Sequence, residues 1–183
     1  LIKMKLIGEG DLDRVRAVRS VLPETPIIVD ANEGWEPDMV DRFATELKTL
    51  QVQLVEQPLP ASADAALADL AHPLPFCADE SCHTSADLER LKSRYDVINI
   101  KLDKSGGLTE ALKLRQSALD AGMQVMVGCM VATSLSMAPG VLVAQGAVVV
   151  DLDGPLLLAE DRENGLLYDN EGFVHPPKAA LWG

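Results

Sequence analysis

The sequence predicts an α/β fold in which short buried strands alternate with helices. Charged residues recur at the ends of apolar runs, at intervals of 22 to 26 residues. One strand, one helix and two loops take roughly 30 residues, so each interval fits one β/α unit. Helical patterns fill the gaps, and this alternation implies a parallel sheet with right-handed crossovers. The charged residues that end the first five runs are Lys5, Asp30, Glu56, Asp79 and Lys101.

Seven apolar runs have the length and composition of strands. The expected strands are Ile2–Leu6, Ile27–Asp30, Gln53–Glu56, Phe76–Asp79, Val97–Leu102, Gln124–Gly128 and Ala147–Asp151. The helix Asp11–Leu22 opens with an acid suited to an N-cap and repeats apolar residues at helical spacing. Pro37–Leu50 begins with a proline, which a first helical turn tolerates. The other expected helices are Ala63–Ala71, Ser85–Arg94, Leu108–Ala121 and Ser134–Gln145.

The sheet is expected to close into a barrel, because functional groups end most of the strands. An open doubly wound sheet would instead concentrate its site at one switch point. A closed eight-strand barrel takes about 250 residues, whereas this chain has 183. We therefore expect a TIM-like (β/α)7β barrel that lacks its first strand. It is expected to be a portion of a longer protein, and poorly active alone.

Two segments follow from this interpretation. Residues 1–155 are expected to form the barrel, and residues 156–183 a C-terminal tail. Asp169 and Asn170 are turn formers, so the stretch around them indicates a short hairpin in the tail.

Composition excludes several classes of partner. The formal net charge of -12 argues against nucleic acid and anionic membranes, since phosphate binding needs a basic patch. Three cysteines, Cys77, Cys82 and Cys129, suggest no disulfide framework and are consistent with reduced thiols in the cytoplasm. No apolar run is long enough to span a bilayer. No motif fixes the oligomeric state, so a homo-oligomer stays open.

Three acids end consecutive strands and are expected to converge. Asp30, Glu56 and Asp79 would form a costly cluster unless a cation neutralises them. Oxygen ligands favour Mg²⁺, with Mn²⁺ as an alternative, and the absence of His or Cys at these strand ends argues against zinc. Taken singly, each acid is more often a helix cap or a surface ion pair.

Two lysines flank the acids. In an eight-strand ring Lys5 would end the second strand and Lys101 the sixth, so they would lie opposite each other. Two bases on opposite faces of one carbon suit 1,1-proton transfer, that is racemisation or epimerisation. Lys3 lies on the same side of its strand as Lys5, where it could bind a substrate carboxylate.

The last strand carries a second acidic signal. Asp151 and Asp153 are two residues apart, so strand alternation points both in one direction. Two carboxylates facing a substrate would suit a cationic group such as a free amine. The alternative is a turn built by the sequence Asp153-Gly154-Pro155.

Several motifs together resemble those of the enolase superfamily, in its muconate-lactonizing branch. They are KMK (Lys3–Lys5), VDAN (Val29–Asn32), EQPLP (Glu56–Pro60), ADES (Ala78–Ser81) and NIKLDK (Asn99–Lys104). Within that branch, GCM (Gly128–Met130) and DLDGP (Asp151–Pro155) resemble the dipeptide epimerases, especially the L-Ala-D/L-Glu epimerases of murein peptide recycling.

The resemblance implies a small dipeptide substrate and a full set of site residues. Mg²⁺ would bind Asp30, Glu56 and Asp79, and Lys5 and Lys101 would be the acid/base pair. Asp151 and Asp153 would bind the dipeptide α-ammonium, and Cys129 and Val131 would line the substrate pocket. The resemblance also implies an N-terminal α+β capping domain, which this chain lacks and on which the tail 156–183 would pack. The alternatives are an N-acylamino-acid racemase, an o-succinylbenzoate synthase or a non-catalytic barrel.

Overall fold

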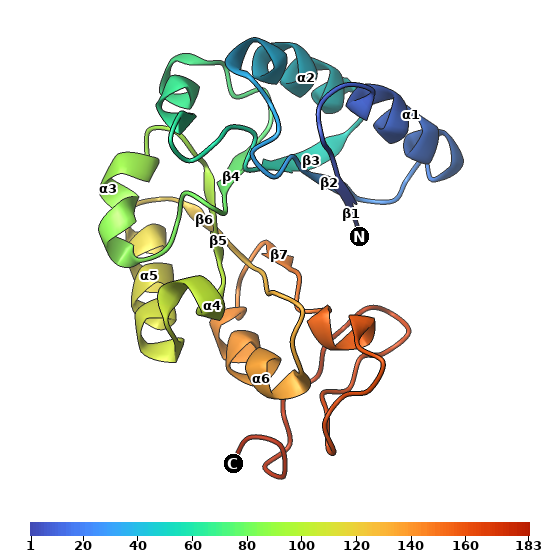
Figure 1. Cartoon of the computed structure of the whole chain (residues 1–183), viewed down its shortest axis with the longest axis vertical. Coiled ribbons are helices and arrows are strands. Elements are labelled where there is room, and N and C mark those ends of the chain that lie inside the picture. Colours follow the sequence, from blue (N-terminus) through green and yellow to red (C-terminus); the bar gives the residue numbers. More distant parts are fainter. The chain divides into compact units, whose positions relative to one another are not determined.

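A computed structural model describes residues 1–183, in which seven strands alternate with helices (Figure 1). The strands are β1 (Ile2–Lys5), β2 (Ile27–Asp30), β3 (Val52–Glu56), β4 (Phe76–Ala78), β5 (Val97–Ile100), β6 (Gln124–Val127) and β7 (Val149–Val150). The α-helices are α1 (Asp11–Val21), α2 (Pro37–Thr49), α3 (Leu88–Leu91), α4 (Leu102–Ser105), α5 (Leu108–Asp120) and α6 (Ser134–Val143). Short 3₁₀ segments are η1 (Asp64–Asp69), η2 (Ser85–Asp87) and η3 (Gly154–Leu157). The predicted α/β alternation is confirmed.

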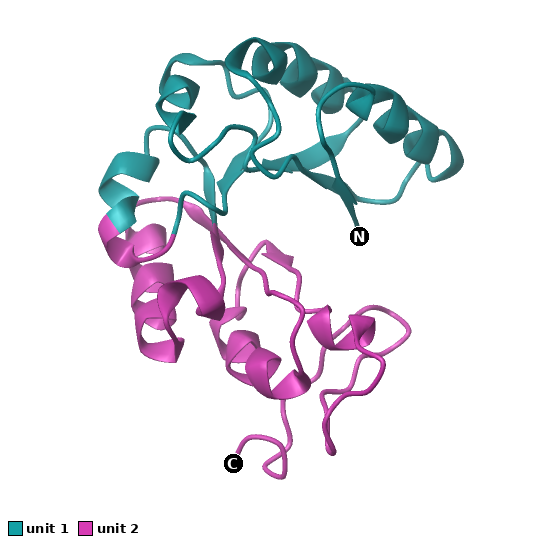
Figure 2. Ribbon diagram, in the orientation of Figure 1, with its two compact units in different colours: residues 1–82, 87–98 teal, residues 83–86, 99–183 magenta.

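The chain divides into two compact units (Figure 2). Unit 1 comprises residues 1–82 and 87–98, and unit 2 comprises residues 83–86 and 99–183. No helix in either unit combines the length and the hydrophobicity needed to cross a membrane.

Unit 1 is built on parallel strands that pair in chain order. β1 pairs with β2, β2 with β3, and β3 with β4, all in parallel. The register sets Lys5 opposite Asp30, and Asp30 opposite Glu56. Because the strands run in one direction, the residues that end them form a row at one edge of the sheet.

Apolar side chains fix the helices of unit 1 on this sheet. β2 is buried along its whole length, as expected for a parallel strand covered on both faces. α1 and α2 lie side by side along β1 to β3 (Figure 1). From α2, Val40, Phe43 and Leu47 are buried at helical spacing, and the ring of Phe43 meets that of Trp35 edge-on at 5.2 Å between centroids.

Unit 2 contains the parallel pair β6 and β7 with α5 and α6 packed together. α6 begins at Ser134 without a cap from its own N-cap side chain. Asp161 of the tail takes that role: Ser134 N donates to its carboxylate at 2.9 Å, and the Ser134 hydroxyl donates to it as well. Tyr168 forms an antiparallel bridge with Val174, so the hairpin expected in the tail is confirmed at this pair. The packing of the tail on a capping domain stays a prediction.

Four segments differ from the expected elements, and the first is the strand expected at Ala147–Asp151, which spans only Val149–Val150. Ala63–Ala71 is a shorter 3₁₀ segment, and Ser85–Arg94 is a 3₁₀ turn followed by a single α-helical turn. The strand expected at Val97–Leu102 ends at Ile100, and Leu102 opens the unexpected helix α4. In η1 the Asp64 side chain is buried and bonded to distant residues, so tertiary hydrogen bonds rather than helical periodicity fix this segment.

Two leucines of α5 test how far burial determines stability. Leu114 is 1% exposed, whereas Leu112 of the same helix is 43% exposed. We expect Leu114→Ala to lower the free energy of unfolding by about 2–5 kcal/mol, because it removes buried methyl groups and leaves a cavity. Leu112→Ala is the matched control and should cost less than about 1 kcal/mol. Equal losses in urea unfolding would contradict the packing of α5.

Candidate active site

Five of the residues singled out in the sequence lie in unit 1, and we name them the strand-end cluster: Lys3, Lys5, Asp30, Glu56 and Asp79. Lys5 Nζ donates to Asp30 Oδ2 at 2.5 Å. Lys3 Nζ lies 2.8 Å from Glu56 Oε2 and 3.3 Å from Asp30 Oδ2. Asp30 and Glu56 are completely buried, and Asp79 is 2% exposed. The parallel register thus brings two ammonium groups against buried carboxylates.

The charges of the strand-end cluster shift the pKa of Glu56. Burial, together with the negative charges of Asp30 and Asp79, raises the pKa of Glu56 to about 7. The ammonium of Lys3 acts in the opposite direction and lowers the pKa of Glu56. The cluster therefore favours the uptake of positive charge, whether a proton or another cation.

The donors of the strand-end cluster fit a hard divalent cation. Carboxylate oxygens are the ligands that Mg²⁺ prefers, and three buried carboxylates are costly without a neutralising charge. No three His, Cys, Asp or Glu side chains are gathered in the geometry of a metal site. Instead, the Lys3 ammonium lies against Asp30 and Glu56. A cation bound there would compete with Lys3, and the metal triad stays a prediction.

Sequence reasoning missed several polar residues that adjoin the strand-end cluster. Asn32 Nδ2 donates to Glu80 Oε1 at 3.3 Å, and burial together with Asp79 raises the pKa of Glu80. Gln57 is fully buried directly after Glu56. All three residues stand inside the motifs quoted above, so attention to the neighbours of each acid could have found them.

The other predicted site residues lie in unit 2. They are Lys101, Cys129, Val131, Asp151 and Asp153. Burial raises the pKa of the Cys129 thiol, and the charges of Asp151 and Asp153 raise it too, whereas Lys101 lowers it. The structure therefore brings both acids and the lysine within electrostatic range of one thiol. Val131 is 62% exposed in the segment between β6 and α6.

The loop after β7 is packed tightly against the segment after β6. A Cβ on Gly154 would lie 2.7 Å from the Met130 carbonyl oxygen and 3.3 Å from Cys129 Sγ. Only glycine therefore fits at this position without a shift of the backbone. The close approach fixes Asp153, the preceding residue, beside Cys129.

Tyr168 of the tail is a further residue that the sequence did not reveal. Its hydroxyl donates to the Leu152 carbonyl oxygen at 2.7 Å, between the two acids in sequence. Burial raises the pKa of Tyr168, as do Cys129, Asp161 and Asp153. The tail thus reaches the acidic loop, and no pattern in the sequence indicated this contact.

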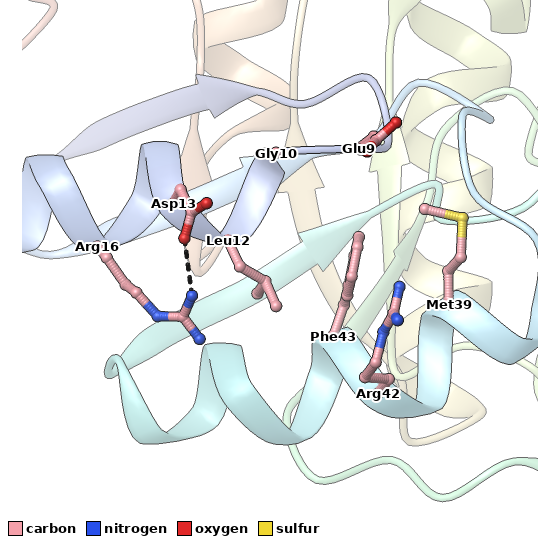
Figure 3. Close-up of a pocket in the computed structure, with 8 residues that line it drawn as sticks. All are labelled: Glu9, Gly10, Leu12, Asp13, Arg16, Met39, Arg42 and Phe43. Atoms are coloured by element: carbon pink, nitrogen blue, oxygen red, sulfur yellow. Dashed lines mark hydrogen bonds and ion pairs between the residues drawn. The ribbon is translucent and has the colours of Figure 1, made fainter.

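A cavity of about 430 Å³ lies elsewhere in unit 1, between α1 and α2 (Figure 3). Leu12 of α1 and Phe43 of α2 point into the space between the helices. Arg16 pairs with Asp13 at 2.9 Å, and the Arg42 guanidinium stands 4.9 Å from the Phe43 ring centroid. None of the predicted site residues lines this cavity.

Comparison with known proteins gives consistent matches along the chain. Residues 1–180 match the enolase C-terminal domain-like family. The chain is 47% identical over 183 residues to an N-acetyl-D-glutamate racemase from Pseudoalteromonas, covering 100% of the chain and 58% of that protein. It is 46% identical over 175 residues to the L-Ala-D/L-Glu epimerase of Escherichia coli, covering 96% of the chain and 54% of that protein. The chain spans about half the length of the curated relatives it matches.

Solved structures agree with these matches. An enolase family member from Agrobacterium tumefaciens with homology to dipeptide epimerases, solved with sodium and L-Ala-L-Glu, is 54% identical with a TM-score of 0.95. That match covers 99% of this chain and 55% of the other. A dipeptide epimerase from Cytophaga hutchinsonii, complexed with Mg and D-Ala-L-Val, is 32% identical with a TM-score of 0.91, covering 96% and 51%.

The pKa of Glu56 predicts how stability depends on pH. Between the ordinary glutamate value of 4.5 and about 7, folded Glu56 holds a proton that the unfolded chain releases. The free energy of unfolding should therefore fall as pH rises through this window, by about 3 kcal/mol from this group. Urea unfolding at pH 5 and 7.5 in the presence of a chelator measures the change.

Glu56→Gln is the control for this pH dependence, because it removes the titrating group and keeps its size. Glu80 is present in both proteins, so the difference between the two slopes reports Glu56 together with the acids coupled to it. Identical slopes would show that folding does not raise the pKa of Glu56.

Proposed function

Because the chain belongs to the enolase C-terminal domain-like family, we propose that the protein epimerises a dipeptide of the L-Ala-D/L-Glu type. The observation that carries this proposal is the strand-end cluster, in which ammonium groups and buried carboxylates stand at neighbouring strand ends. Relatives named as epimerases and racemases support the reaction class. We extend the proposal to murein peptide recycling in the cytoplasm.

Asp30, Glu56 and Asp79 are proposed to hold Mg²⁺, with Mn²⁺ as an alternative. The bound ion would stabilise the negative charge that develops on a substrate carboxylate when the adjacent carbon loses a proton. Solved relatives with Mg and a dipeptide support this cofactor. Lys3, which contacts both Asp30 and Glu56, is proposed to turn toward the substrate carboxylate.

Lys5 and Lys101 are proposed to exchange the α-proton on opposite faces of the carbon. One lysine, neutral at the start, removes the proton and becomes an ammonium, which leaves an enolate. The other lysine, an ammonium at the start, donates its proton to the opposite face and becomes neutral. For Lys5 to act, it must first give up its 2.5 Å contact with Asp30.

Asp151 and Asp153 are proposed to bind the free α-ammonium of the dipeptide, while Cys129 and Val131 line the pocket. Burial is the main cause of the raised pKa of the Cys129 thiol, and the negative charges of Asp151 and Asp153, which raise it too, support a negatively charged surface at this position. A cationic group is the ligand that such a surface favours.

The second candidate function is racemisation of an N-acylamino acid. A relative named N-acetyl-D-glutamate racemase, at 47% identity, favours it as specifically as the epimerases favour the first. An N-acylated substrate has no ammonium for Asp151 and Asp153, so these two acids support the dipeptide. The strand-end cluster serves either substrate.

Proton NMR in D₂O tests the reaction directly. With Mg²⁺ and L-Ala-L-Glu, the Glu α-proton signal should disappear and the second diastereomer should appear. Exchange on N-acetyl-glutamate but not on the dipeptide would select the second candidate. Exchange on neither, with Mg²⁺ bound, would reject both substrates.

Removing each lysine in turn should distinguish proton exchange on the two faces of the substrate α-carbon. We expect Lys5→Ala and Lys101→Ala to slow epimerisation by about 10²–10⁴-fold, because each lacks one acid/base group. Each variant should still exchange the α-proton of one diastereomer, and the two should differ in which one. Identical behaviour on both diastereomers would contradict the two-base assignment.

Asp153→Asn tests the ammonium site. Loss of one charge should reduce kcat/KM for L-Ala-L-Glu by about 10-fold or more, since a charged hydrogen bond contributes about 1.5–3 kcal/mol. Turnover of N-acetyl-glutamate, if present, should change far less. Equal losses on the two substrates would exclude Asp153 from ammonium binding.

A further inference from the structure

Gln57 is a buried amide in an uncommon backbone conformation. It directly follows Glu56, is completely buried, and has a φ of 37°. A buried amide is costly unless its donors and acceptors are bonded, and positive φ is uncommon outside glycine. The position therefore calls for a specific set of contacts.

The backbone around Gln57 connects three strand ends. Gln57 N donates to the Cys77 carbonyl oxygen of β4 at 2.8 Å. Its own carbonyl oxygen accepts from Glu33 N at 2.9 Å, and the Glu56 carbonyl oxygen accepts from Ala31 N at 3.0 Å. The peptides on both sides of Gln57 thus join the ends of β2, β3 and β4, which carry the acids of the strand-end cluster.

The carbonyl end of the Gln57 side chain holds the peptide of Asp79. Its Oε1 accepts from Asp79 N at 2.8 Å and from Ser81 N at 3.2 Å. β4 ends at Ala78, so the Asp79 N–H lies just beyond the strand. A side chain from the neighbouring strand end supplies its acceptor.

The amide end of Gln57 is anchored in the opposite direction. Nε2 lies 2.8 Å from the Leu59 carbonyl oxygen, 2.8 Å from Ser81 Oγ and 2.9 Å from Tyr95 Oη. Both hydroxyls in turn donate to Asp64 Oδ2, at 2.6 and 3.1 Å. Because their protons point to Asp64, their oxygens accept from Gln57, which fixes the orientation of the amide.

Asp64 completes this network, and its buried negative charge is compensated. Arg94 Nη1 lies 2.6 Å from Asp64 Oδ1, so the buried carboxylate has a cationic partner. The Asp64 carboxylate, both hydroxyls and the Gln57 amide are all bonded, and a bonded buried network of this kind is rigid. The network ends on the peptide of Asp79.

We propose that Gln57 is a positioning residue, whose amide fixes the Asp79 peptide beside Glu56 and thereby sets the affinity of the strand-end cluster for a divalent cation. This inference rests on the proposed function, since it takes Asp79 and Glu56 to be cation ligands. Residues that orient metal ligands typically account for 10–100-fold in metal affinity.

Titration with Mn²⁺, followed by electron paramagnetic resonance of the free ion, tests this role. Gln57→Met keeps the length of the side chain and removes both amide groups. We expect it to weaken Mn²⁺ binding by about 10–100-fold. Competition by Mg²⁺ restricts the measurement to the shared site.

Tyr95→Phe is the matched control. It removes the hydroxyl at the far end of the network but keeps the bond from Asp79 N to Gln57 Oε1. Both variants lose buried hydrogen bonds, so both should be destabilised in urea. Only Gln57→Met should weaken Mn²⁺ binding strongly, and Tyr95→Phe should stay within about threefold of the unchanged protein, because the bond to Asp79 is intact.

The outcomes separate this inference from the proposed function. If the unchanged protein binds no Mn²⁺, the proposed cation site is overturned and the positioning role with it. If it binds Mn²⁺ and Gln57→Met binds equally well, only the positioning role is overturned. Equal weakening of Mn²⁺ binding in Gln57→Met and Tyr95→Phe would assign Gln57 a purely structural role.

Should Gln57→Met not fold, Gln57→Asn gives the same comparison, since asparagine tolerates positive φ but is too short to reach Asp79.

Discussion

The burial of carboxylates at adjacent ends of parallel strands is the constraint on which unit 1 depends. Register alone sets Asp30 beside Glu56, out of reach of water. Burial, together with the negative charge of Asp30, raises the pKa of Glu56 to about 7. Positive charge must then come from within the chain or from solution. Lys3 supplies it from within, two residues before Lys5 on the same strand, so the costly acids and their compensation arise from the same sheet geometry.

The strand ends that carry the buried acids are also held by hydrogen bonds outside the sheet. Repelling carboxylates would separate if their peptides were free to move, so each strand end needs an anchor besides the sheet. Gln57 is such an anchor, through its own backbone and through its side chain. The hydroxyls of Ser81 and Tyr95, which accept from the Gln57 amide, donate in turn to Asp64. Asp64 is itself paired with Arg94. Unit 1 therefore places a buried hydrogen-bonded network, closed by the Asp64–Arg94 ion pair, behind the charged strand-end cluster.

The sequence predicts what depends on chain order, and it misses what depends on packing. The ends of β1, β2 and β3 were predictable because each apolar run stops at a charged residue, and parallel pairing then aligns them. The helix expected at Ala63–Ala71 was wrong in type, because the bonds of Asp64 to Ser81 and Arg94 override its apolar spacing. The contact of Tyr168 with Leu152 was out of reach for the same reason, since 16 residues separate two partners that no motif relates.

The Tyr168 contact has a consequence for anyone who wishes to redesign this protein. Leu152 stands between Asp151 and Asp153, and its carbonyl oxygen is fastened to a residue of the tail. Asp161, in the same tail, begins α6 by accepting from Ser134. Mutant libraries restricted to the two acids and their neighbours in sequence would thus omit the segment that holds the backbone between them. Exchanging residues 160–175 between relatives would therefore alter the support of Leu152 and the start of α6 together.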